Sequence, residues 1–225
     1  PIRTSPMKKN LAAKPLPTRP VTMSAAGHIR LGPVLGIPAV LTELGVEPRR
    51  AFAQAGVDER LFDEADNRMP LEDIGRLVDV CVALTDCPHF GLLLGERFDL
   101  STFGPLGLLM QNSPTVGEAV RSLVLHFHVH DRGAAPVLLA SEASSVILGY
   151  SIYRHGASAS AQVYDAAIWI GYRMLAELCG PTWKAGHVQF SHGRPRSIAA
   201  YRRVFGPNVS FDAEVSGVVF ASSWM

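Results

Sequence analysis

Three histidines and an aspartate lie close together in the stretch "LVLHFHVHD", residues 123–131. Imidazole and carboxylate groups bind zinc and transfer protons, so this cluster is the first candidate for chemistry. If the stretch is helical, His126 and His130 are about 40° apart and share a face, whereas His128 points almost the opposite way. A helix therefore offers only a His-x-x-x-His pair, and a metal would need a third ligand from elsewhere.

Three interpretations of the pair His126 and His130 remain open at this point. Polar side chains near the C-terminus of a helix can bond to its last carbonyls, and a protonated histidine there suits the helix dipole. The pair can instead line a ligand pocket, or it can bind a metal in a metal sensor or metal-dependent enzyme. The H-E-x-x-H pattern of metalloproteases is absent, because Phe127 stands where its glutamate would be. We assign no metal ligand and expect no cofactor.

Other sequence patterns typical of enzymes are missing. There is no G-x-S-x-G elbow, no P-loop and no G-x-G-x-x-G turn after a strand. The three cysteines, Cys81, Cys87 and Cys179, form no C-x-x-C pair, which argues against both a disulfide framework and a zinc knuckle. We therefore expect a protein of the reducing cytoplasm that is not an enzyme.

The charge balance also excludes classes of partner. Lys and Arg number 21 and Asp and Glu 20, and no basic stripe marks a DNA-binding face. No run of about 18 apolar residues predicts a membrane span. Residues 1–27 carry five prolines and little apolar content, which indicates a flexible arm or an added leader.

Helical patterns dominate the chain up to about residue 133. Apolar spacing predicts helices over 34–45 and 70–86, and another from Pro48 to a stop at Gly56. Two short helices are expected in "PHFGLLLGERF" and "GPLGLLMQNSP". Thr115 and Glu118 form a capping box that begins a further helix, expected over 115–131.

The pattern changes at residue 134. "APVLLASEASSVILGYSIY" predicts a β-hairpin, a long helix follows over 158–179, and "HVQFSH" alternates like a strand. A short helix and two short strands complete the chain. We predict an α+β fold in which a helical N-terminal half precedes an antiparallel sheet covered by helices, forming a single domain over residues 28–225.

Aromatic side chains on these elements suggest where a ligand would bind. Tyr153 ends the hairpin, and Tyr164 and Trp169 lie on the helix 158–179. Aromatics at helical spacing belong more often to a core than to a site, but they can also surround a mostly apolar cavity. We predict a pocket between this helix, the hairpin 136–153 and the end of helix 115–131, lined by Tyr153, Tyr164, Trp169, His126 and His130.

The C-terminal stretch "FSHGRPRSIAAYRRVFGPNVSFDAEVSGVVFASSWM" resembles a known family. It is similar to the C-terminal signature of the N-terminal regulatory domain, labelled arabinose-binding-like, of bacterial AraC-type transcription regulators. The matching positions are Phe190, His192, Arg194, Pro195, Tyr201, Phe205, Gly206, Phe211, Val219, Phe220 and Trp224. The helical first half looks like the same family, so the similarity covers about residues 30–225.

The resemblance implies a small-molecule-sensing and dimerisation domain. In this family a C-terminal helix-turn-helix domain binds DNA, and that domain is absent from this chain. The resemblance therefore implies a small-molecule effector and a homodimer, with DNA contacted only through the absent domain and no membrane partner. The family label does not fix arabinose as the effector, and no binding residue is carried over. A dimerisation module without a ligand is a further alternative.

Overall fold

The computed structural model describes residues 27–140, 144–153 and 160–225. The arm expected over residues 1–27 lies outside them, except for Gly27. Within these ranges no helix is long and apolar enough to cross a membrane.

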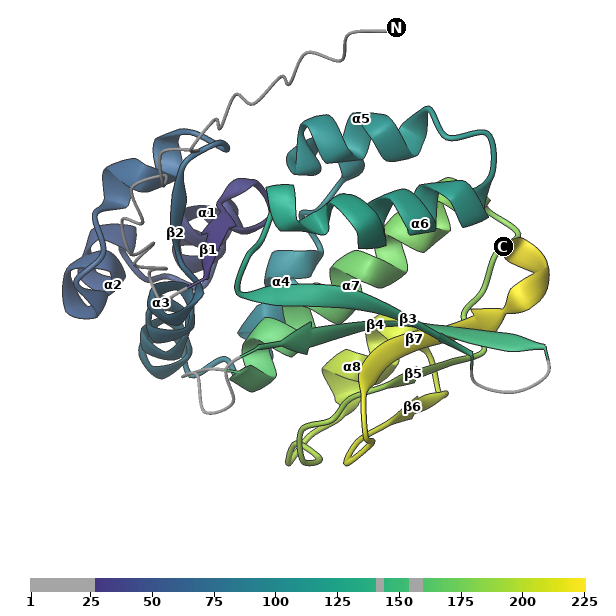
Figure 1. Cartoon of the computed structure of the whole chain (residues 1–225). Coiled ribbons are helices and arrows are strands. Elements are labelled where there is room, and N and C mark those ends of the chain that lie inside the picture. Colours follow the sequence, from purple (N-terminus) through teal and green to yellow (C-terminus); the bar gives the residue numbers. More distant parts are fainter. Residues whose placement is uncertain (1–26, 141–143, 154–159) are drawn as a thin grey trace, which may run out of the picture.

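The first half of the chain is helical, as its apolar spacing predicts (Figure 1). Pro48 begins α2, and Gly56 ends it with a left-handed φ of 65°. Thr115 caps α6, because its Oγ1 accepts a hydrogen bond from the Glu118 N–H at 3.1 Å. The helices are α1 (Ile37–Glu43), α2 (Pro48–Ala55), α3 (Leu71–Thr85), α4 (Phe90–Gly95), α5 (Pro105–Gln111) and α6 (Val116–His126), and the 3₁₀ turns are η1 (Gly32–Val34), η2 (Glu59–Asp63), η3 (Leu100–Phe103) and η4 (Phe127–Val129).

A small two-stranded sheet, which the sequence analysis did not predict, joins the start of this helical half to the segment before α3. Strand β1 (His28–Arg30) pairs antiparallel with β2 (Arg68–Pro70). Ile29 also forms a bridge with Asp131, just after η4. The start of the domain is thereby tied to the end of the histidine-rich segment.

The second half forms a five-stranded sheet in the order β3-β4-β7-β5-β6. The first three pairings are antiparallel and β6 joins β5 in parallel, so the fold is α+β as predicted, with one parallel pair at the edge. The elements are β3 (Ala134–Ala140), β4 (Ser145–Ile152), α7 (Ser160–Cys179), β5 (His187–Gln189), α8 (Ala199–Phe205), β6 (Val209–Ser210), β7 (Ser216–Ala221) and η5 (Ser222–Trp224).

Helix α7 lies between the two halves (Figure 1). It packs closely on α4. A Cβ added to Gly91 of α4 would lie only 2.1 Å from the carbonyl oxygen of Gln162 on α7, so the two backbones leave no room for a side chain there. Ala166 belongs to the apolar core around α1–α4, whereas Ile168 and Leu175 belong to the core beside the sheet. This single helix therefore contributes to both apolar cores.

Candidate functional site

A cavity of about 90 Å³ lies between α7, the β3–β4 hairpin and the end of α6. The sequence predicts a pocket in this place, and α3 and β1 supply walls that it did not predict. The walls are mostly apolar and include Ile29, Ile74, Leu123, Phe127, Leu148 and Ala166. An apolar pocket with few polar groups is typical of a small-molecule site.

Gly171 borders this cavity from the middle of α7. A Cβ added there would have no atom within 4 Å. No neighbouring group therefore requires a glycine, although glycine in a helix interior is about 1 kcal/mol less favourable than alanine. Because Gly171 has no side chain, the space beside it remains part of the cavity.

Among the described residues around the cavity, three have side chains with nitrogen or oxygen atoms: His130, Tyr150 and Gln162. His130 is 3% exposed. Its ring packs edge-on against Phe103, with ring centres 4.7 Å apart, and against Phe127 at 5.3 Å. Its Nδ1 is buried and has no hydrogen-bond partner within the described residues.

The imidazole of His130 is held in its neutral form. Burial lowers its pKa from 6.5 to about 3, and the nearby positive charges of Arg30 and Arg68 add to this effect. Arg68 donates hydrogen bonds to the carbonyls of Val129 and His130, and Arg30 forms an ion pair with Asp66 at 2.6 Å. Both guanidinium groups are therefore already engaged with protein groups.

Tyr150 borders the cavity from β4 and is bonded to a buried carboxylate. Its hydroxyl donates to Asp131 Oδ2 at 2.8 Å, and the Gly133 N–H donates to Oδ1 at 2.6 Å. Burial raises the pKa of the Asp131 carboxyl, and these two donors oppose part of that increase. Burial and the neighbouring carboxylate also raise the pKa of Tyr150 well above 10, so its hydroxyl keeps its proton.

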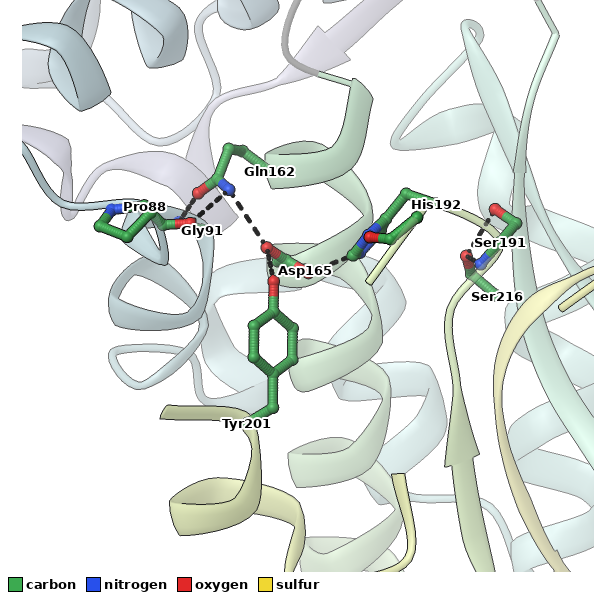
Figure 2. Close-up of polar contacts among 9 residues, drawn as sticks. Pro88, Gly91, Gln162, Asp165, Ser191, His192, Tyr201 and Ser216 are labelled. Atoms are coloured by element: carbon green, nitrogen blue, oxygen red, sulfur yellow. Dashed lines mark hydrogen bonds and ion pairs between the residues drawn. The ribbon is translucent and has the colours of Figure 1, made fainter. Parts of the chain in front are cut away.

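Gln162 connects the cavity to a second buried polar cluster (Figure 2). Its Oε1 accepts from the Gly91 N–H at 2.8 Å, while Nε2 donates to the Pro88 carbonyl at 2.9 Å and to Asp165 Oδ2 at 3.3 Å. Asp165 is fully buried. It also accepts from the Tyr201 hydroxyl at 2.7 Å, and His192 Nε2 lies 3.0 Å from its Oδ1.

This Asp165 cluster joins α7 to α8 and to the loop after β5. Burial by itself lowers the pKa of His192, but its bond to Asp165 and the attraction of that carboxylate outweigh this and raise the pKa overall. A carboxylate near the start of a helix can also be explained by its favourable interaction with the positive end of the helix dipole. The structure instead shows Asp165 accepting hydrogen bonds from elements far along the chain.

The structure separates the two histidines that the sequence pairs. Helix α6 ends at His126 and η4 follows, so the prediction of a continuous helix to residue 131 is wrong. A 3₁₀ turn rotates by about 120° per residue instead of 100°, which removes the shared face. His126 is exposed with its Nδ1 3.0 Å from the Ser122 carbonyl, and His128 is exposed as well.

None of the three predicted aromatic residues is part of the cavity wall. Tyr153 is 62% exposed and lies outside the cavity wall. Tyr164 packs edge-on behind Tyr150, with ring centres 6.2 Å apart. Trp169 packs against Tyr172 and Phe205 on the other side of α7. Only His130, of the five predicted lining residues, borders the cavity.

Sequence reasoning missed Tyr150, Gln162 and Gly171. Tyr150 could have been found from the strand pleat, because it shares a face with the buried residues Leu148 and Ile152, whereas Tyr153 is on the other face. Gln162 carries no comparable signal in the sequence. Within the described residues, no group of three or more His, Cys, Asp or Glu is arranged to hold a metal ion.

Residues 45–225 match the model of the N-terminal arabinose-binding domain of AraC transcription regulators. The chain belongs to this family. The resemblance noted in the sequence is thereby confirmed.

Two curated relatives are regulators. The chain is 26% identical over 190 residues to the HTH-type transcriptional regulator VirS of Mycobacterium tuberculosis, covering 84% of this chain and 56% of the relative. It is 24% identical over 173 residues to the ornithine utilization regulator of Pseudomonas aeruginosa, covering 77% and 51%. The chain thus spans about half the length of these relatives.

A solved structure has the same fold. The transcriptional regulator CdpR of Pseudomonas aeruginosa matches with a TM-score of 0.52 and 21% identity. The match covers 77% of this chain and 52% of the other.

Proposed function

We propose that this regulatory domain senses a small molecule in the cavity beside α7 and thereby controls DNA binding by a domain that these residues do not include. In this proposal the effector binds one conformation better than another and shifts the balance between them. The family supports a regulatory role, and the apolar cavity supports a small-molecule effector.

The observation that carries the proposal is the open space at Gly171. A close-packed core has few voids larger than a water molecule, and each void forfeits dispersion contacts. Here a helix interior has glycine where alanine is sterically allowed, and the space it leaves adjoins a cavity of about 90 Å³. We infer that this space is occupied when the effector binds.

Filling the cavity from Gly171 tests this function. In a thermal-shift screen of cell metabolites, we expect at least one compound to raise the Tm of the wild-type chain. The variant Gly171→Leu places a side chain in the space and should not respond to that compound. The matched variant Glu177→Leu adds leucine at an exposed position of the same helix and should respond like the wild type. A compound that stabilises Gly171→Leu equally would contradict binding in this cavity.

We also propose that the domain forms a homodimer through α5 and α6. These two helices pack against each other, and large apolar side chains remain exposed on both: Leu108 is 59% exposed and Leu125 is 68% exposed. A C₂ dimer would bury such side chains against the same surface of a second copy.

Sedimentation of the purified chain tests the dimer. The wild type should sediment as a dimer and Leu125→Glu as a monomer, because a buried charge without a partner opposes association. Leu44→Glu changes an exposed leucine directly after α1 and should leave the dimer intact. A wild-type monomer, or a dimer that survives Leu108→Glu and Leu125→Glu together, would refute this interface.

Neither alternative function gains support from the site. The metal hypothesis depends on His126 and His130 acting together, and only His130 is buried. A dimerisation module without a ligand does not account for the open space at Gly171.

A further inference from the structure

The chemistry of the cavity wall restricts which molecules it can hold. Its three polar side chains are His130, Tyr150 and Gln162 among the described residues. The Tyr150 hydroxyl donates its hydrogen bond to Asp131, and both hydrogens of the Gln162 amide are bonded to Pro88 and Asp165. Neither side chain has a hydrogen left to donate to a ligand.

A negatively charged ligand would therefore lose its hydration without gaining donors. An ionised carboxylate in an apolar site is expensive unless it is paired and hydrogen-bonded. The neutral imidazole of His130 supplies no charge, and Arg30 and Arg68 are bonded to Asp66 and to backbone carbonyls. The polar part of the wall thus does not suit an anion.

A positively charged ligand fits no better. Asp131 and Asp165 are bonded to the wall residues Tyr150 and Gln162, but neither carboxylate is itself part of the wall. Each already accepts hydrogen bonds from protein groups. The guanidinium groups of Arg30 and Arg68 also add positive potential at His130.

One polar side chain at this site still lacks a partner. Nδ1 of His130 is buried and unpartnered, although buried polar atoms in native proteins are nearly always hydrogen-bonded. The ring contacts both Phe103 and Phe127, and it borders the cavity. Nδ1 has almost no accessible surface, so a group inside the cavity would reach this ring at its other nitrogen, Nε2, which also forms no hydrogen bond within the described residues.

We propose that the effector is a small uncharged molecule, mostly apolar, with one hydroxyl-like group that hydrogen-bonds to His130. This inference rests on the proposed function of the cavity and adds the chemical class of its ligand. A hydroxyl suits the site because it can donate to Nε2 or accept from it, whichever tautomer is present. The cavity of about 90 Å³ is of the same order as a roughly 150 Å³ apolar cavity that binds benzene in another protein.

Four probes of similar size test the ligand class: phenol, benzene, benzoate and benzylammonium, titrated into the ¹⁵N-labelled chain and followed by NMR. We expect phenol to bind the wild type about five-fold more tightly than benzene, which is the net effect of one ordinary hydrogen bond. Benzoate and benzylammonium should not bind at concentrations that saturate phenol. His130→Leu should bind phenol and benzene equally, and the exposed-site variant His128→Leu should keep the preference.

The ¹⁵N signal of the His130 ring gives a second measurement on the unmodified protein, in case His130→Leu does not fold. Phenol should shift the Nε2 resonance and benzene should not. Equal binding of phenol and benzene to the wild type overturns the inference, as does a preference that survives in His130→Leu. Tighter binding of either charged probe, or no binding by any of the four, also overturns it.

These failures differ from failure of the proposed function. If a charged metabolite stabilises the wild type but not Gly171→Leu, the cavity is a sensing site and only the ligand class is wrong. If no compound distinguishes the wild type from Gly171→Leu, the sensing function itself is wrong.

Discussion

The stability of this domain in acid should depend on His130. Its pKa in the folded chain is about 3, against an ordinary value of 6.5 in an unfolded chain. Because the folded pKa is the lower one, the unfolded chain takes up a proton first as the pH falls. The contribution of the neutral His130 side chain to the free energy of unfolding is therefore complete above pH 6.5 and is lost progressively between pH 6.5 and 3. At pH 5 the loss amounts to roughly 2 kcal/mol.

Urea unfolding at pH 7 and pH 5 measures this loss. The free energy of unfolding of the wild type should decrease by about 2 kcal/mol more than that of His130→Leu over this interval. Any difference in stability between the two proteins at pH 7 cancels, because each is compared with itself. The exposed neighbour His128 provides the control, and His128→Leu should follow the wild type.

Equal losses of stability in the wild type and His130→Leu would refute this reasoning. If the wild type and His130→Leu lose the same free energy between pH 7 and pH 5, the imidazole is not held neutral in the folded domain. The description of His130 as a buried and uncharged member of the cavity wall would then be wrong, and with it the argument that His130 offers no charge to a ligand.

Three further predictions concern α7 and its neighbours. Asp165→Ala removes the acceptor of three hydrogen-bonding groups, among them the buried Tyr201 hydroxyl, and should lower the free energy of unfolding by roughly 3–5 kcal/mol in a urea titration, whereas Asp63→Ala at an exposed position should change little; equal effects would contradict the Asp165 cluster. The raised pKa of His192 means that its stabilising bond is complete below about pH 6.5 and is lost as the pH rises through the folded pKa. The Tm should therefore fall from pH 6.5 upward more steeply in the wild type than in His192→Asn, and identical pH profiles would count against this bond. Gly171→Ala should stabilise by up to about 1 kcal/mol in thermal unfolding because its Cβ meets open space, whereas Gly91→Ala should destabilise because its Cβ would meet the Gln162 carbonyl; a stabilised Gly91→Ala would refute the close packing of α4 and α7.

The sequence predicts the regular elements well where apolar spacing is sustained. Helices α3 and α7 and the β3–β4 hairpin lie close to their expected positions, because their burial patterns follow the periods of helix and strand. The strands β1 and β2 have three residues each, which is too short for alternation to be visible. Their pairing joins residues about 40 positions apart, and nothing local in the sequence specifies it.

A cavity lies where the sequence predicts a pocket, but only His130 of the five predicted lining residues borders it. The end of α6 depends on tertiary contacts, since the His130 carbonyl accepts from the Arg30 N–H at 2.9 Å and from Arg68 at 3.1 Å. These contacts favour a 3₁₀ turn over another α-helical turn, so helical geometry alone pairs the wrong histidines. The partners of Asp165 on the far side, His192 and Tyr201, lie 27 and 36 residues away along the chain.

The side chain of Gln162 belongs to both polar regions of the domain, and this has a consequence for signalling. The same amide borders the cavity and bonds to Asp165, which is bonded in turn to Tyr201 on α8. A molecule that displaces this amide would weaken the attachment of α8, and loosening α8 would change the affinity of the cavity by the same factor. Under the proposed function, ligand binding at one side of α7 and the position of α8 at the other would therefore be thermodynamically linked. Helix α7 would then transmit binding in the cavity to α8.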